Sequence, residues 1–282
     1  MDSPIDVDFI GIGTPKSGST WLADCLAGHP EICFSKMKEL HFFDERGSSY
    51  FIRKIVSNYT YENCGKSWYD KQFAHCSKDS IKGEFTPSYI YCPTALKRIK
   101  ERCMNVKLIV VLRDPVARAF SQYLNDIRAG GIKNIPFEEA LCKYDNYVEK
   151  GLYYKYLKDW YHHFGKENIL VATFDEIKEN PKNLLRKVFS FLGVKNIDYI
   201  PECFNKKSNE AKRGLFPLVS YFLVRIKLFL RENNMKRVLW ILDKFKLKKL
   251  AYFIITRNTI SLKSYPMISE ETGKKIKKNF FN

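Results

Sequence analysis

The sequence of 282 residues lacks the features that mark several classes of protein. Its eight cysteines include no Cys-x-x-Cys pair, which excludes a zinc ribbon and a thioredoxin-like motif and favours reduced thiols. With 14 glycines and 11 prolines the chain is neither collagen-like nor of low complexity. No basic and apolar leader precedes Phe9, and the uncharged run at 214–224 is too short to cross a bilayer about 30 Å thick as a helix. We therefore expect a soluble, cytoplasmic protein.

Positive charge is in excess: 48 Lys and Arg oppose 31 Asp and Glu, a net charge of +17. The excess is uneven, because residues 215–282 hold 15 basic and 4 acidic residues and so carry +11. Such a field attracts nucleic acid, anionic membrane or small anions, although a solvated basic face has the same composition. Apolar clusters at 222–231 and 238–244 alternate with the basic residues. This pattern predicts a basic amphipathic helical segment that contacts a membrane, covers a groove or packs into the core.

Buried strands and amphipathic helices alternate along the rest of the chain. Apolar runs predict strands at 7–13, 107–112 and 169–174, and helical spacing predicts helices from near Val116 and at 136–143, 153–164 and 181–192. This alternation predicts the α/β class, with a P-loop-like central parallel β-sheet flanked by helices. We expect a single domain, with an α/β core at 1–214 and the basic helical extension at 215–282.

A glycine-containing loop joins the first predicted strand to a helix at residues 13–21, Gly-Thr-Pro-Lys-Ser-Gly-Ser-Thr-Trp. Such a loop directs backbone N–H groups and the positive end of the helix dipole at one point, which suits a phosphate. The spacing approaches GxxxxGK[ST], but Ser19 stands where that motif has lysine, and Lys16 lies inside the loop. Because a nucleoside triphosphatase needs that lysine and carboxylate help with Mg²⁺, a kinase-like NTPase is the weaker alternative.

A second anion-binding pattern follows the strand at 107–112. Arg113 offers a planar, permanently charged donor fork at the carboxyl end of that strand, and Ser121, about two helical turns later, adds a hydroxyl. A surface ion pair at a helix start would look the same in isolation. In an open parallel sheet, however, both loops lie outside the carboxyl ends of the strands, so the two patterns could clamp one nucleotide with two phosphate ends.

Together these motifs resemble the sulfotransferases that use 3′-phosphoadenosine 5′-phosphosulfate (PAPS), in their bacterial and heparan-type branch. Residues 15–21 are similar to the family's 5′-phosphosulfate loop, and residues 113–121 are similar to its 3′-phosphate segment. The resemblance implies PAPS as the cofactor, 3′-phosphoadenosine 5′-phosphate (PAP) as its product, and no metal. The cofactor contacts that it implies are Pro15, Lys16, Ser17, Gly18, Ser19, Thr20, Trp21, Arg113 and Ser121, with Lys212 or Arg213 from a late loop that is only loosely similar.

Sulfuryl transfer needs a cation at the leaving oxygen and a base for the acceptor. Lys16 can place an ammonium against the leaving oxygen beside the loop amides, and the resemblance assigns it the same role. Residues 38–43 (KELHFF) are similar to the family segment whose Glu is taken as the general base, a position that Glu39 fills. His41 is the rival, because an unperturbed imidazole pKa of about 6.5 suits base work at neutral pH. We favour Glu39, and the resemblance decides the choice.

The expected activity is transfer of the sulfuryl group from PAPS to an acceptor hydroxyl or amine by in-line displacement. Residues 83–89 (GEFTPSY) are similar to another family segment, but Phe85 follows Glu84 where glycan-modifying relatives often carry lysine. This difference argues against a heparin-like polyanion, and the acceptor is then a small molecule, sugar or lipid. A nucleic-acid-binding module would explain the charge, but no such motif is visible, so no nucleic-acid partner is expected. Peripheral membrane contact through 215–282 stays open.

Overall fold

The protein is described from a computed structural model, which covers residues 3–44, 61–206, 212–214 and 259–261. Internal packing divides the chain into two units. The first, here called the sheet unit, comprises residues 1–114 and 152–208; the second, the helical unit, comprises residues 115–151 and 209–282. The predicted extension at 215–282 lies outside the described residues except at 259–261, so the expected division at residue 214 stays a prediction.

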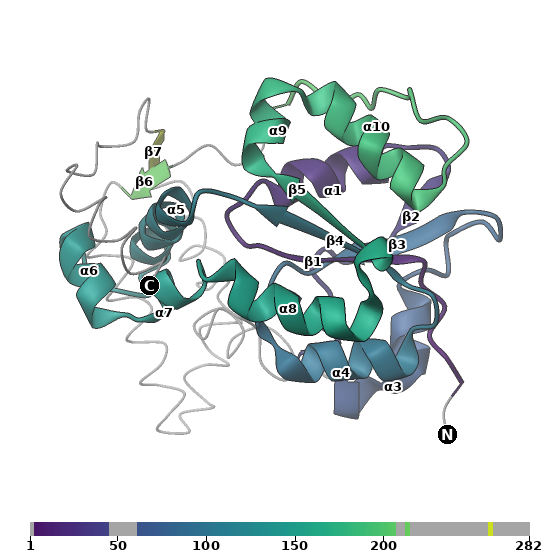
Figure 1. Cartoon of the computed structure of the whole chain (residues 1–282), viewed down its shortest axis with the longest axis horizontal. Helices are drawn as coiled ribbons and strands as arrows, with labels where there is room; N and C mark the ends of the chain where they lie inside the picture. Colours follow the sequence, from purple (N-terminus) through teal and green to yellow (C-terminus); the bar gives the residue numbers. More distant parts are fainter. Residues whose placement is uncertain (1–2, 45–60, 207–211, 215–258, 262–282) are drawn as a thin grey trace, which may run out of the picture. The chain divides into compact units, whose positions relative to one another are not determined.

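Five parallel strands form the sheet of the sheet unit, in the order β2-β3-β1-β4-β5 (Figure 1). The strands are β1 Phe9–Gly13, β2 Ile32–Phe34, β3 Ile81–Phe85, β4 Lys107–Leu112 and β5 Ile169–Thr173. Strands β1, β4 and β5 confirm the three predicted from apolar runs. The α/β class with a central parallel sheet is thereby confirmed, and β2 and β3 extend it.

Helices cover both faces of this sheet (Figure 1). One face packs against α1 Ser19–Ala27, α9 Phe174–Glu179 and α10 Pro181–Leu192, and the other against α3 Tyr61–Lys71, α4 Pro93–Arg102 and α8 Tyr153–Phe164. Short 3-10 turns occur at Tyr89–Tyr91 and Lys166–Asn168. Leu22 and Leu185 lie in the first core, and Ile99 and Trp160 in the second. The spacing that predicted α8 and α10 therefore reflects one buried stripe on each helix.

Strand β3 was not predicted, because Ile-Lys-Gly-Glu-Phe has neither an apolar run nor clean alternation. Its pairing with β1 places Gly83 opposite Phe9 and Phe85 opposite Gly11. Each phenylalanine ring occupies the space that a Cβ on the opposing glycine would need. The two glycines therefore permit the close packing of β1 on β3, and this register aligns the carboxyl ends of the two strands.

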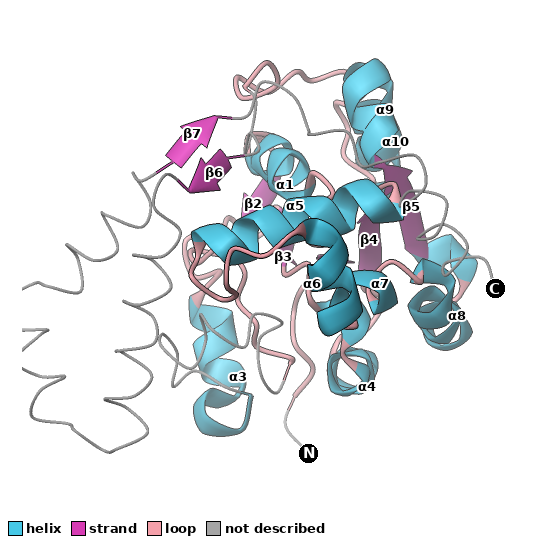
Figure 2. Ribbon diagram, turned by 90° about the vertical axis from the view of Figure 1, so that its left-hand side faces the viewer, coloured by secondary structure: helices cyan, strands magenta, loops and turns pink. Residues whose placement is uncertain are grey.

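The helical unit contains α5 Pro115–Arg128, α6 Phe137–Lys143 and α7 Asn146–Glu149, with α5 packed against both others. Phe120, Tyr123 and Phe137 form the centre of its core. Strand β6, Lys212–Gly214, pairs antiparallel with β7, Thr259–Ser261 (Figure 2), and packs against α5. The helices expected from near Val116 and at 136–143 are confirmed as α5 and α6.

The expectation that all cysteines are reduced thiols is wrong for one pair. Cys33 on β2 and Cys76 in the turn after α3 approach to a Cα–Cα distance of 5.7 Å and form a disulfide. Their separation of 43 residues hides this pairing in the sequence. The other cysteines whose state is described are free thiols: Cys25, Cys92, Cys103, Cys142 and Cys203.

Within the described ranges, no helix has both the length and the apolar character that a membrane span requires.

Candidate active site

The predicted site segments of the sheet unit leave the sheet at one edge. The loop 14–18 follows β1, the segment 35–44 follows β2, residues 86–88 follow β3, and Arg113 follows β4. Because these strands are parallel and adjacent, their carboxyl ends share this edge. Lys38 Nζ donates to Thr20 Oγ1 at 3.4 Å, which ties the segment after β2 to the start of α1.

Buried hydroxyl groups hold the loop after β1 in place. The backbone N–H and the hydroxyl of Thr14 both donate to the carbonyl of Val111 on β4, each at 2.9 Å. The Thr14 oxygen also lies 2.6 Å from Ser17 Oγ, and both side chains are fully buried. The Ser17 hydroxyl, predicted as a cofactor contact, therefore also has a structural role in fixing the loop.

Left-handed backbone shapes the end of this loop. Lys16 has a φ of 69°, and Gly18, the N-cap of α1, has a φ of 89°. The positive φ favours glycine at this position, and a Cβ there would also lie 2.7 Å from Ile177 Cδ1, so that side chain would have to move. Gly18 is the N-cap of α1 but has no side chain to accept a hydrogen bond from the first turn. That turn also contains no acidic residue. The positive end of the helix dipole is therefore not neutralised, which suits an anion.

The remaining loop residues differ in exposure. Pro15, Lys16 and Thr20 are half-buried, whereas Ser19 is buried. Trp21 is also buried, and its indole Nε1–H donates to the carbonyl of Phe204 at 3.2 Å. The ring of Trp21 thus packs in the core, and the contact of Trp21 with a cofactor stays a prediction.

Arg113 is fixed at the rim of the loop. Its Nη1 donates to the carbonyl of Lys16 at 2.9 Å, and its guanidinium lies 4.3 Å from the centre of the Phe174 ring. The Tyr153 hydroxyl donates to the Arg113 carbonyl at 2.8 Å. These contacts orient the guanidinium beside Lys16, so the sheet unit brings two predicted cationic site residues together.

Three other predicted cofactor residues lie in the helical unit. Ser121 is on α5, and Lys212 and Arg213 are on β6, whose backbone packs against α5. The structure therefore groups these three within one unit, and their contact with a cofactor stays a prediction. Ser121 follows Arg113 by eight residues along the chain, as the motif requires.

An imidazole between two carboxylates lies in the segment after β2. His41 Nε2 is 3.6 Å from Glu39 Oε2, and His41 Nδ1 is 2.9 Å from Asp44 Oδ2. Ser88 Oγ donates to the same Asp44 oxygen at 3.1 Å. Glu39 and His41 have φ values of 53° and 51°, so the backbone of this segment is left-handed at both residues. Such strain is typical of functional sites. Asp44 and Ser88 were missed, although Asp44 stands at i+3 from His41.

The three side chains of this array differ in exposure, from Glu39 at the surface to Asp44 in the core. The exposed fractions of the side chains are 42% for Glu39, 18% for His41 and 2% for Asp44. Burial raises the pKa of Asp44 to about 7, opposed by the hydrogen bond from Ser88 and by the charge of Arg98. The deep carboxyl group therefore holds the ring in place, and the outer carboxylate faces the surface.

A second buried carboxyl group, that of Glu84, is linked to this array by hydrogen bonds. Glu84, on β3, is fully buried and accepts hydrogen bonds from Thr86 Oγ1 at 2.6 Å, Tyr89 OH at 3.2 Å and Tyr69 OH at 3.4 Å. Burial raises the pKa of Glu84 to about 7. The Thr86 oxygen in turn accepts from the backbone N–H of His41 at 3.3 Å. A polar chain thus connects the core of the sheet with the left-handed backbone of His41.

Residues 6–213 match the family model described as the sulfotransferase domain. The chain belongs to this family. Over 196 residues it is 32% identical to mouse heparan sulfate glucosamine 3-O-sulfotransferase 3B1, covering 66% of this chain and 46% of that protein. The chain thus spans less than half the length of this curated relative.

Solved structures agree with the fold of the sulfotransferase domain. A sulfotransferase from Alicyclobacillus acidocaldarius has a TM-score of 0.62 and 26% identity, covering 72% of this chain and 87% of that one. The sulfotransferase domain of the curacin biosynthetic pathway has a TM-score of 0.51 and 17% identity, covering 68% of this chain and 75% of that one. The family assignment made from the two anion motifs is confirmed.

Proposed function

We propose that this sulfotransferase domain transfers the sulfuryl group of PAPS to an acceptor hydroxyl and releases PAP. The observation that carries the proposal is the arrangement at the sheet edge. The loop that contains Lys16 lies at the start of α1, where no side chain caps the helix, and the segment with Glu39 and His41 is hydrogen-bonded to that helix start through Lys38. Since Ser19 replaces the lysine of GxxxxGK[ST], the same loop is poorly suited to a nucleoside triphosphatase.

Each residue of the site has a separate chemical role. PAPS, when bound, supplies the electrophilic sulfur and a leaving phosphate oxygen. Lys16 and the first amides of α1 stabilise the charge that grows on that oxygen. Glu39, with His41 beside it, takes the proton of the acceptor hydroxyl. Asp44 accepts the Nδ1–H of His41, which leaves Nε2 facing Glu39. Arg113 contributes a fork for a phosphate group.

The acceptor is proposed to be a sugar hydroxyl on a molecule with little negative charge. The relative named above acts on a glucosamine of heparan sulfate, which supports a sugar. Phe85 supports an acceptor with little negative charge, because it occupies the position where glycan-modifying relatives often carry lysine. Its buried ring packs on Gly11. This position therefore offers no cation to a polyanion. The cytoplasmic location stays a prediction.

Transfer of ³⁵S from labelled PAPS tests the activity directly. The panel contains a neutral oligosaccharide, an N-sulfated heparan oligosaccharide, a glycolipid and a phenol, and we expect the neutral oligosaccharide to be labelled most. Lys16→Ala should transfer far less label. In parallel, PAP should raise the melting temperature well above the shift that ATP causes, since residues 113–121 are similar to the family's 3′-phosphate segment and ATP lacks that phosphate. Equal melting-temperature shifts with PAP and ATP, together with no labelled product, would contradict the proposed activity. Preferred labelling of the heparan oligosaccharide would overturn only the proposal that the acceptor has little negative charge.

A further inference from the structure

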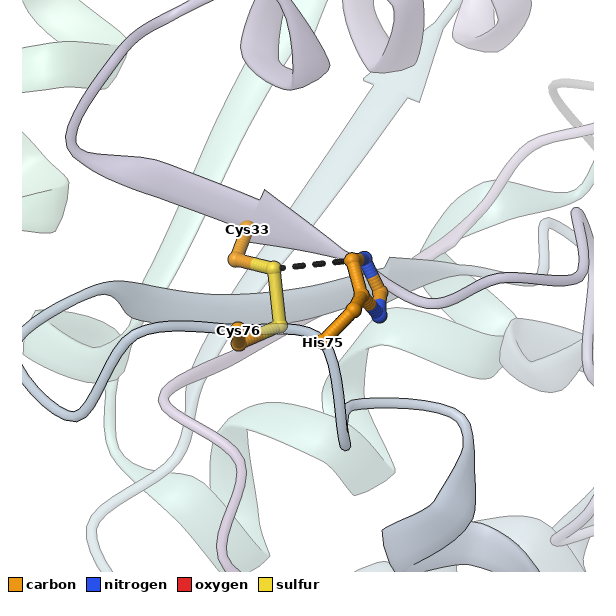
Figure 3. Close-up of side chains that lie close together, drawn as sticks. All are labelled: Cys33, His75 and Cys76. Carbon is orange, nitrogen blue, oxygen red and sulfur yellow. Dashed lines mark hydrogen bonds between the residues drawn. A yellow bond between two sulfur atoms is a disulfide. The ribbon is translucent and has the colours of Figure 1, made fainter.

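Two cysteines and a histidine meet outside the proposed active site. Cys33 lies on the edge strand β2, and His75 and Cys76 lie in the turn after α3 (Figure 3). The three side-chain ligand atoms lie within 4.8 Å of one another, and within the described part of the chain they form the one group of this kind. Imidazole and thiolate are the ligands that zinc prefers, so this is a candidate metal site.

The backbone holds both sides of the cluster without help from the disulfide. Cys33 is aligned with Lys82 in the pairing of β2 with β3. The turn is closed by the hydrogen bond from Cys76 N to Phe73 O at 2.9 Å, and Phe73 is buried. Lys36 N donates to Gln72 O at 3.0 Å and so joins the turn to the end of β2. Reduction of the disulfide should therefore leave the two sulfurs facing each other.

The separations fit a tetrahedral ion. Zn–S bonds of about 2.3 Å and Zn–N bonds of about 2.0–2.1 Å place sulfur and nitrogen ligands about 3.6 Å apart and two sulfurs about 3.8 Å apart. His75 Nε2 already lies 3.5 Å from Cys33 Sγ, the contact marked by the dashed line in Figure 3. Only the sulfurs must separate once their bond is broken, and side-chain rotation can achieve this while the Cα atoms stay near 5.7 Å.

We propose that Cys33, His75 and Cys76 bind a thiophilic divalent cation of the zinc class, in a site that reduction of the disulfide opens and oxidation closes. A dithiol reductant supplies two electrons and two protons, which yields two thiols and the oxidised cyclic dithiol. The cation then displaces both thiol protons and is bound by two thiolates, the neutral imidazole and one water. In a reducing compartment the dithiol form predominates, and there the site is available. The proposal is independent of sulfuryl transfer.

Cobalt is a suitable probe, because thiolate ligands give Co²⁺ an intense charge-transfer absorption in the near ultraviolet. The full chain is reduced with a phosphine, desalted without oxygen and titrated with Co²⁺, next to an oxidised sample. We expect one Co²⁺ per reduced chain with this absorption, its loss on adding Zn²⁺, and no such absorption in the oxidised chain. Cys33→Ser and Cys76→Ser should abolish it. His75→Ala should weaken binding at least about tenfold, since even the loss of an outer partner costs 10- to 100-fold.

Cys142→Ser is the matched control, because Cys142 is an exposed free thiol in the helical unit and should not alter cobalt binding. The melting temperature of each variant, measured without ligand, shows whether the fold has survived. Absence of the absorption in the reduced chain would overturn the proposal. So would equal absorption in oxidised and reduced samples, its survival in both cysteine variants, or an unchanged affinity in His75→Ala.

Discussion

His41 Nε2 lies 3.6 Å from Glu39 Oε2, in a stretch where both residues have left-handed backbone. At this distance the two side chains share one proton-accepting region, so an acceptor hydroxyl that reaches one also meets the other. Because the two groups lie side by side, a pH–rate profile alone does not assign the base to either residue. The question of which is the base therefore needs substitutions as well as pH dependence.

The base assignment is tested by Glu39→Gln and His41→Asn. With Glu39 as the base, Glu39→Gln should lower kcat by about 10²–10⁴, the usual contribution of general base catalysis, while PAP still raises the melting temperature. His41→Asn should retain substantial activity. An active Glu39→Gln beside an inactive His41→Asn with normal PAP binding would assign the base to the histidine.

Asp44 should act as a positioning residue. Asp44→Asn replaces the charged acceptor that holds His41 Nδ1 by a neutral amide oxygen, so kcat should fall by no more than it does in His41→Asn, with little change in KM. The pKa of Asp44 is raised to about 7, so the wild-type rate should decline as pH falls through 7, and the variant should lack this limb. Ser88→Ala is the milder control. A variant with the wild-type rate and pH profile would contradict this role.

Lys16 should matter for turnover more than for cofactor affinity. Lys16→Ala removes the cation proposed for the leaving oxygen, and kcat should fall about 10²–10³, the range for losing one transition-state donor. Lys97→Ala, an exposed lysine on α4, is the matched control and should keep the wild-type rate. A loss of tenfold or less in Lys16→Ala would exclude the residue from charge stabilisation.

Glu84 should make the fold less stable as pH rises toward neutrality. Its pKa is raised from 4.5 to about 7 by burial, so between these values the folded state binds more protons than the unfolded state. The contribution of Glu84 to the free energy of unfolding is most favourable below about pH 4. It declines by up to about 3 kcal/mol as pH approaches 7.

Urea denaturation between pH 4.5 and 7.5 measures this slope. Glu84→Gln keeps an acceptor for Tyr69 and Tyr89 and should flatten the slope, whereas Glu101→Gln, an exposed glutamate on α4, should not. A slope that Glu84→Gln leaves unchanged would show that the group titrates equally in both states.

Elements with strong periodicity were predicted from the sequence alone. The apolar run of β4 and the buried stripe of α8 have the bounds expected, because burial on both faces of a sheet, or on one face of a helix, leaves a pattern in neighbouring residues. The loop from Gly13 to Trp21 was recognised for the same reason, since its glycines, its lysine and its adjoining helix are contiguous.

Tertiary structure alone decided the features that depend on residues far apart in the sequence. Strand β3 could not be predicted from its own sequence, because it is defined by its pairing with β1. In that pairing Phe9 and Phe85 pack on glycines of the opposing strand. The support of His41 by Thr86 and Glu84, and the disulfide between Cys33 and Cys76, join separate elements in the same way. Local sequence specifies backbone preference and burial, but long-range contacts arise only when whole elements pack, and those contacts position the reactive groups.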